Sequence, residues 1–264
     1  MHISESVESA CGKSAFPLDK SPLSKSADNT IVFERVHAIL AKIDRRERRV
    51  ELWGEESKTG YNTKNRRILL SWMRDFCSDH SLSSESFHLS VCLLDRFVSG
   101  VGGAYVDRHN LQLAGVAALL VSTKSVVSVE SGVDVQERIH LTARRVLELC
   151  GERVDVGEIR EVNRLERVLL ESLEWEVECS TCVRGVSEVL ECMSKLVVDA
   201  SGVLRACCAL CDQLVLEDAF YKYRLRDICV SVFECVSGVS LRGERVDICC
   251  RVWVLDKYEL YNKK

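Results

Sequence analysis

The sequence predicts an all-α protein. It has 264 residues but only two prolines, Pro17 and Pro22, so no proline interrupts the chain after residue 22. Proline costs about 3 kcal/mol inside a helix, and its absence favours a largely helical chain, although strands avoid proline too. Apolar residues also recur at spacings of three and four, which is the period of an amphipathic helix. With 47% hydrophobic and 29% charged residues, the composition is that of a globular protein with a sizeable core.

Charge and hydropathy exclude several classes of protein. The net charge is −4, so the chain as a whole has no basic surplus of the kind that nucleic-acid-binding proteins carry. No uninterrupted apolar run reaches the length of a membrane-spanning helix. The first residues, MHISESVESACGKSAF, contain no apolar segment typical of a secretory signal. We therefore expect an intracellular protein that binds neither nucleic acid nor membranes.

The chain contains 14 cysteines, an unusual number for an intracellular protein. Two CxxC pairs, Cys179/Cys182 and Cys208/Cys211, match the spacing of zinc ligands within a pair. Most other cysteines lie in apolar runs, where a free thiol acts as a small buried hydrophobe. We therefore predict free thiols and neither metal nor other cofactor, with a zinc site at these four cysteines as a remote alternative.

The first part of the chain predicts a tail and one helix. Residues 1–30 are rich in Ser and Lys and poor in large apolar residues, so we expect a disordered tail. Residues 31–60 form the next unit, a helix over 31–47 followed by a polar, glycine-containing connector. That helix is predicted by apolar residues at helical spacing, namely Val32, Val36, Ile39, Leu40 and Ile43.

A first set of helices is predicted within residues 61–177. We place them at 63–80, 84–99, 107–124, 138–150 and 157–175, with Gly, Ser, Asp or Asn between them. The third is apolar on all sides, which marks a buried helix. Its small residues would let neighbouring helices approach closely, as a central helix ringed by four others requires: Ala114, Gly115, Ala117 and Ala118.

A second, shorter set of helices is predicted within residues 178–264. We place them at 181–198, 201–217, 222–237 and 246–262. Valine is abundant here and favours strands, but its spacing is that of a helical face and does not alternate. Too few residues follow Gly238 for two full helices with connectors, so this unit is shortened.

Four motifs in order resemble the cyclin box. They are NRRILLSWM at Asn65–Met73, FHLSVCLLDRFVS at Phe87–Ser99, LQLAGVAALLVSTK at Leu111–Lys124 and VNRLERVLLESLEW at Val162–Trp175. They cover less than half of the chain and are similar to cell-cycle cyclins of types A, B and D. The resemblance implies the cyclin fold, in which an N-terminal helix precedes two stacked helical repeats, the first of five helices and the second shortened here.

The resemblance also implies a function. Cyclins are not enzymes but regulatory subunits that bind and activate a cyclin-dependent protein kinase in the nucleus or cytoplasm. An active kinase needs the Glu of its αC helix paired with a Lys on strand β3, and a cyclin holds αC in that inward position. We therefore expect a regulator of this kind in cell-cycle control. The alternative is a cyclin-fold transcription factor or a transcriptional cyclin.

The resemblance assigns two pairs of charged residues. Lys124 and Glu166 match the residues that hydrogen-bond to the kinase around its αC helix. A lysine at the end of a long apolar helix also suits the negative end of the helix dipole. Arg66 and Asp95 match an internal ion pair that ties the first helix of the repeat to the second.

A third feature implied by the resemblance is a shallow substrate-docking groove on the first helix of the repeat. In several cyclins this groove binds Arg-x-Leu motifs of substrate proteins, which are a further class of expected partner. One position departs from the family, because Asn65 replaces the usual Met. The groove positions are Ile68, Leu69, Trp72, Asp75 and Gln112.

A second departure from the family is the polar insertion Ser125–Val135, which lies beside the expected kinase surface.

Overall fold

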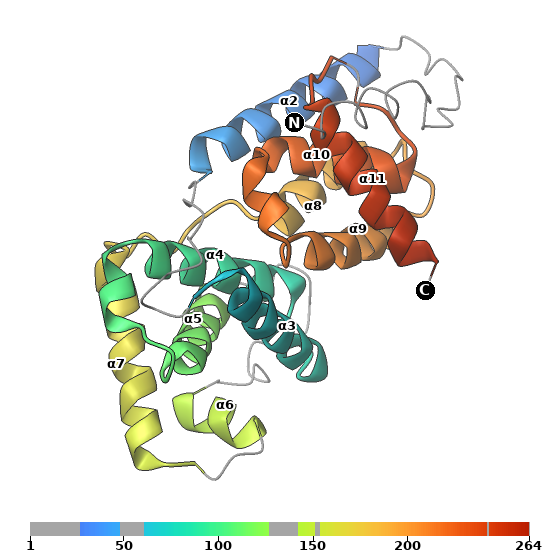
Figure 1. The fold of residues 1–264 in the computed structure, drawn as a ribbon. Helices are drawn as coiled ribbons and strands as arrows, with labels where there is room; N and C mark the ends of the chain where they lie inside the picture. Colours follow the sequence, from blue (N-terminus) through green and yellow to red (C-terminus); the bar gives the residue numbers. More distant parts are fainter. Residues whose placement is uncertain (1–26, 48–60, 127–141, 151–153, 242, 264) are drawn as a thin grey trace, which may run out of the picture.

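The computed structural model describes residues 27–47, 61–126, 142–150, 154–241 and 243–263. Within these residues every regular element is a helix, as Figure 1 shows. The all-α prediction is therefore confirmed. The tail up to residue 26, the connector 48–60 and most of the predicted insertion after Lys124 lie outside the described residues.

The N-terminal helix α2 (Ala27–Arg46) begins four residues before its predicted start. Its apolar face, with Val36, Leu40 and Ile43, is buried against α8 (Cys182–Met193) and α10 (Leu225–Ser237). Gly185 of α8 makes this close approach possible. A Cβ atom there would lie 2.8 Å from Cδ1 of Ile43 and 2.7 Å from Sγ of Cys229.

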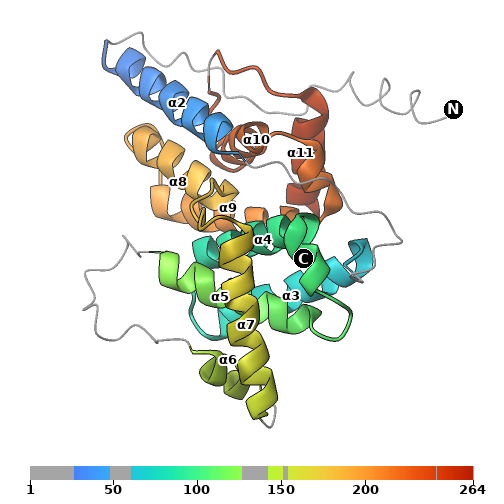
Figure 2. The same cartoon turned by 90° about the vertical axis from the view of Figure 1, so that its left-hand side faces the viewer.

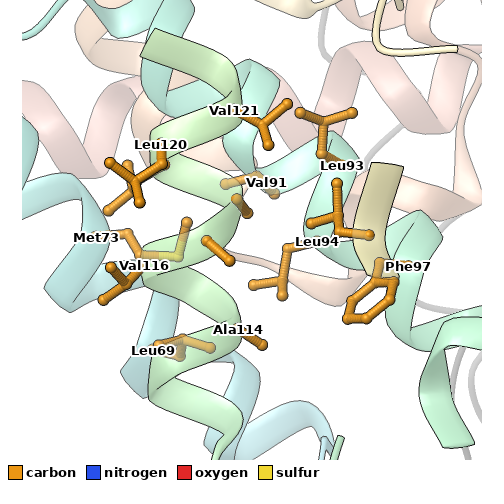
Figure 3. Close-up of a cluster of buried hydrophobic side chains, with 14 of the residues drawn as sticks. Leu69, Met73, Val91, Leu93, Leu94, Phe97, Ala114, Val116, Leu120 and Val121 are labelled. Carbon is orange, nitrogen blue, oxygen red and sulfur yellow. The ribbon is translucent and has the colours of Figure 1, made fainter. Parts of the chain in front are cut away.

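The first repeat consists of five α-helices, four of which surround a central one. These are α3 (Thr63–Asp79), α4 (Ser84–Ser99), α5 (Leu111–Ser125), α6 (Ala143–Leu149) and α7 (Val156–Ser172), with a 3₁₀ helix η1 (Val101–Tyr105) after α4. Helix α5 packs against the other four. In Figure 3 its apolar side chains lie among those of α3 and α4. The predicted central helix is therefore confirmed.

Local side-chain bonds set where these helices begin. Asn62 caps α3 by accepting a hydrogen bond from the Asn65 amide at 3.0 Å. Helix α5 begins at Leu111, four residues after the predicted start. Asp107 accepts hydrogen bonds from the amides of His109 and Asn110, at 2.8 and 3.0 Å, and so holds this stretch in a turn.

The second repeat is built around α10. It contains α8, α9 (Ala200–Leu214), a 3₁₀ helix η3 (Asp218–Lys222), α10 and α11 (Ile248–Asn262). Helix α10 packs against α8, α9, α11 and also α2. The N-terminal helix therefore supplies the fourth neighbour of α10, and Figures 1 and 2 show it lying on this repeat. The four helices predicted for residues 178–264 are all present.

The segment before α10 differs from its prediction. Helix α10 begins at Leu225 rather than at residue 222, because Arg224 has an extended backbone with ψ 141°. The amide of Leu225 donates a hydrogen bond to Oε1 of Glu47 at 3.1 Å. A side chain that follows α2 thus caps the helix, and no local pattern around residue 222 encodes this contact.

Candidate functional site

The two residues matched to kinase binding lie together at the surface of the first repeat. Nζ of Lys124 is 2.5 Å from Oε1 of Glu166, although the residues are 42 positions apart. The Lys124 side chain is 56% exposed and that of Glu166 is 18% exposed. The site is therefore an accessible ammonium group held beside a more sheltered carboxylate.

The packing of α5 against α7 determines the position of this pair. Leu165 and Leu169, on either side of Glu166, are fully buried and fix the rotation of α7. On α5 every residue from Ala114 to Ser122 is buried, and Lys124 is the first long polar side chain after them. The ammonium group thus lies at the negative end of the α5 dipole, which favours it.

Three apolar residues that are not buried follow this pair, one on α7 and two in the link beyond it. Leu170 is one turn after Glu166 and half-buried, as is Val177. Between them Trp175 is 66% exposed, which is unusual for so large an apolar side chain. The φ angles of Glu174 and Trp175 are 53° and 63°, a left-handed conformation that costs non-glycine residues energy. Sequence reasoning placed Trp175 in a motif, but its exposure depends on this backbone turn.

The predicted internal ion pair between Arg66 and Asp95 joins α3 to α4. Arg66 donates from Nε to Oδ1 of Asp95 at 3.1 Å and from Nη2 to Oδ2 at 2.8 Å. Both side chains are fully buried. Such a bidentate geometry is the strongest that this pair of groups can form.

Two tyrosine hydroxyls and a backbone carbonyl group of the second repeat also form hydrogen bonds with this ion pair. Sequence reasoning missed these three contacts. The hydroxyls of Tyr61 and Tyr221 donate to Oδ1 and Oδ2 of Asp95. Arg66 also donates to the carbonyl oxygen of Val215, at the end of α9, at 3.0 Å. Burial, with the nearby charge of Asp95, raises the pKa of both tyrosines well above the ordinary value, so both remain neutral donors.

The predicted docking positions divide into core and surface. Leu69 is 6% exposed and packs beneath α5 near Gly115, whereas Ile68 is 59% exposed. Trp72 is half-buried, with its ring centroid 5.9 Å from that of Phe76. The carboxylate of Asp75 accepts two hydrogen bonds from its neighbour Arg74, at 3.1 and 2.8 Å, and Gln112 is exposed. The accessible apolar surface here is thus made by Ile68 and Trp72, and docking stays a prediction.

The four cysteines of the zinc alternative are divided between two hydrophobic cores. Cys179 belongs to the core of the first repeat, whereas Cys182 and Cys211 belong to that of the second, with Sγ atoms 3.1 Å apart. Across the described part of the chain, no three Cys, His, Asp or Glu side chains converge as a metal site requires. None of the helices described there is long and apolar enough to cross a membrane.

Comparison with known families agrees with this geometry. The model of the family "Cyclin, N-terminal domain" matches residues 38–178, more than half of the chain. The chain belongs to the cyclin family. Over 133 residues this cyclin is 28% identical to the G2/mitotic-specific cyclin-A of Hydra viridissima, a match that covers 50% of this chain and 28% of the relative.

Other relatives of this cyclin are named for a different phase of the cell cycle or come from a virus. Over 61 residues it is 38% identical to the G1/S-specific cyclin-E of Caenorhabditis elegans, covering 23% of this chain and 12% of the relative. It is 29% identical over 127 residues to a cyclin homolog of Saimiriine herpesvirus 2, covering 48% and 43% of the two chains. The chain thus spans less than half the length of the curated relatives it matches.

A solved structure supports the fold over most of this cyclin. The crystal structure of a viral cyclin from herpesvirus saimiri superposes with a TM-score of 0.59 and 17% sequence identity. The match covers 87% of this chain and 99% of the viral chain. It therefore extends through the second repeat, which the family model does not reach, and shows that the whole arrangement is a cyclin fold.

Proposed function

We propose that this cyclin is the regulatory subunit of a cyclin-dependent protein kinase, which it binds and activates in cell-cycle control. It has no catalytic role of its own in this proposal, and it acts in the nucleus or cytoplasm. The observation that carries the proposal is the accessible Lys124–Glu166 pair on two tightly packed helices. The relatives named for G2/mitotic and G1/S phases favour cell-cycle control over transcription.

The pair offers a donor and an acceptor at a fixed spacing. The ammonium group of Lys124 has three hydrogens, and Glu166 takes one of them at 2.5 Å. The remaining hydrogens can be donated to carbonyl oxygens of a kinase segment next to αC, and Oε2 of Glu166 can accept from its amides. Because α5 and α7 pack against each other, little backbone entropy is lost when these bonds form.

Apolar residues that follow the pair would supply the remaining binding energy. Leu170, Trp175 and Val177 come after Glu166 in the chain, and Trp175 is exposed. A kinase helix that covers them excludes water from the polar contacts and strengthens them. Shifting a kinase from 1% to 99% active requires about 5.5 kcal/mol of preference for the active state.

Substrate docking is a second part of the proposal. A Leu side chain of an Arg-x-Leu motif would pack on Ile68 and Trp72, and its Arg would approach Asp75. Because Asp75 already accepts two hydrogen bonds from Arg74, the incoming Arg must displace or share that contact. We therefore expect docking weaker than that of cyclins in which the acidic residue is unpaired.

The test is a kinase pull-down and activity assay with a double variant. Lys124→Ala with Glu166→Ala should weaken kinase binding at least about tenfold, because it removes hydrogen bonds to charged groups worth roughly 1.5–3 kcal/mol each. The measurement is the phosphorylation rate of a histone substrate as a function of cyclin concentration. Circular dichroism should show unchanged helix content.

A matched control is available on the opposite repeat. Lys42 and Glu188 form a similar, half-buried ion pair between α2 and α8, with Nζ and Oε1 3.0 Å apart. Changing both to Ala should leave kinase activation at the wild-type level. Normal activation by the Lys124/Glu166 double variant, or an equal loss in both double variants, would refute the site.

A further inference from the structure

Three buried thiols from three helices meet in the core of the second repeat. Cys182 is the first residue of α8, Cys211 lies in the last turn of α9, and Cys229 lies on α10. Each of these side chains is 0% exposed. Helices α8, α9 and α10 pack against one another, so their packing fixes the distances between the sulfur atoms.

Those distances single out one pair of thiols. Sγ of Cys182 is 3.1 Å from Sγ of Cys211 and 3.9 Å from Sγ of Cys229. Formation of a disulfide would require the first pair to close by about 1 Å and the second by about 2 Å. The thiol of Cys229 also donates to the carbonyl oxygen of Cys182 at 3.7 Å. Cys211 is therefore the better placed partner of Cys182.

A small molecule reaches Cys182 through a cavity of about 330 Å³ between the two repeats, which this cysteine lines. Ser180 and Tyr223 also line the cavity and are half-buried, so it extends to the surface. Hydrogen peroxide is little larger than water and fits such a space. Of the three clustered thiols, Cys182 is the one on the cavity wall and meets an entering oxidant first.

We propose that Cys182 and Cys211 are a modification site, at which a peroxide produces a reversible disulfide between α8 and α9. The thiolate of Cys182 attacks one peroxide oxygen, so that an S–O bond forms and the O–O bond breaks. The hydroxide that leaves takes up the thiol proton as water. The thiolate of Cys211 then attacks Sγ of Cys182, which forms the S–S bond and breaks the S–O bond. The second hydroxide takes up the proton of Cys211.

This reaction is balanced and needs no further reactant. The two thiols together lose two electrons and two protons, and one hydrogen peroxide becomes two waters. An external dithiol returns the electrons and restores both thiols. The site lies in the second repeat, away from the Lys124–Glu166 pair, and the proposal does not depend on kinase binding.

The electrostatic environment makes the reaction slow. The contact with Cys211, together with burial, raises the pKa of the Cys182 thiol well above its ordinary value, against an opposite effect of Cys229. Because the thiolate is the form that attacks a peroxide, only a small fraction of Cys182 is reactive at neutral pH. The pair therefore stays reduced until peroxide is present in excess.

The test is treatment of the native full chain with excess hydrogen peroxide, followed by blocking of free thiols and tryptic peptide mass spectrometry. Cys182 lies in peptide 168–184 and Cys211 in peptide 206–222. These peptides should be joined, at two hydrogens below their summed mass, and fragmentation should assign the link to these two cysteines. Dithiothreitol should release them. Absence of the link, or a link from Cys182 mainly to another cysteine, would overturn the proposal.

A background variant removes competing thiols from this experiment. It carries Cys11→Ser, Cys92→Ser and Cys249→Ser. Cys92 lines the same cavity and Cys249 is exposed, whereas Cys11 lies outside the described residues. In urea, where any two thiols can meet, the same treatment should give a mixture of links. The same mixture from the native protein would show that the fold does not select the pair, which would refute the site.

Two matched variants then separate the partners of Cys182. Cys211→Ala should abolish the link and leave a sulfenic acid on Cys182 that dimedone traps, whereas Cys229→Ala should retain the link. Loss of the link in a folded Cys229→Ala variant, or its persistence in Cys211→Ala, would contradict the assignment. Circular dichroism shows whether each variant folds. Because mapping the link in the background protein needs neither variant, an unfolded variant leaves the proposal open to refutation by that first measurement.

Discussion

At the scale of single residues, Asp95 is where the two repeats meet. Its carboxylate accepts from Arg66 of α3, from Tyr61 before α3 and from Tyr221 of η3. Burial alone would lower the pKa of Arg66, but Asp95 together with Tyr221 and Tyr61 more than offsets this effect, so that pKa is raised above its ordinary value. The charge of the one group therefore depends on the other, as in any buried ion pair.

We expect Asp95→Ala to lower the free energy of unfolding by about 3–5 kcal/mol, because it leaves the buried guanidinium without its counter-charge. Tyr221→Phe removes a single hydrogen bond and should cost only about 1 kcal/mol. Urea unfolding followed by circular dichroism measures both. Tyr105→Phe, on the 49% exposed Tyr105, is the control and should change nothing. If Asp95→Ala unfolded at the wild-type urea concentration, the ion pair would have no structural role.

Sequence motifs allowed part of this cluster to be predicted. Arg66 and Asp95 lie in two motifs of one repeat, so the resemblance brought them together. Tyr61 and Tyr221 could not be predicted, since their contacts join residues 34 and 126 positions apart. The contact of Tyr221 with Asp95 depends on how the two repeats pack against each other, and helical periodicity contains no information about that packing. The same holds for Trp175, whose exposure follows from a backbone turn.

At the scale of elements, α5 shows how far a pattern can be taken. Its small residues predicted a helix surrounded by others, and Gly115 indeed lies where a Cβ would be 3.1 Å from Cδ1 of Leu69. It begins four residues later than predicted, because Asp107 bonds to the amides of His109 and Asn110 and holds this stretch in a turn. Helix periods thus predict the buried face well, and the ends depend on local polar bonds.

We predict that Gly115→Val separates α5 from α3 and lowers the free energy of unfolding by about 1–3 kcal/mol, as overpacking does. Because α5 carries Lys124, the same variant should also weaken kinase binding. Thermal unfolding and the pull-down measure these effects. Gln112→Ala changes an exposed residue of the same helix and should leave stability unchanged. A stable Gly115→Val variant with normal kinase binding would contradict this account of α5.

At the scale of the whole molecule, the cysteines serve as probes of the two cores. Burial raises the pKa of Cys77 in the first core and of Cys207 in the second to about 12, whereas Cys249 is exposed. A thiol reacts as its thiolate, and at pH 8 a group with such a pKa is almost wholly protonated. The abundance of cysteine, unusual in the sequence, is thus a consequence of its use as a core residue in both repeats.

We therefore expect iodoacetamide at pH 8 to modify Cys249 in the native protein and to leave Cys77 and Cys207 unmodified. Both protected thiols should become reactive as the pH approaches 12 or when the chain is unfolded in urea. Peptide mass spectrometry measures each site separately. Equal labelling of Cys249 and Cys207 in the native state would show that the second core is open to solvent.

The packing of α2 on the second repeat also affects the order in which the molecule assembles. Its ion pair between Lys42 and Glu188 joins residues 146 positions apart in the sequence. During synthesis α2 leaves the ribosome first, yet α8 and α10 emerge only after the whole first repeat. The apolar face of α2 must therefore stay uncovered until α8 and α10 have been synthesised, so a nascent or truncated chain exposes an apolar helix surface. Chaperone binding and quality control of this cyclin are accordingly expected to begin at its N-terminal helix.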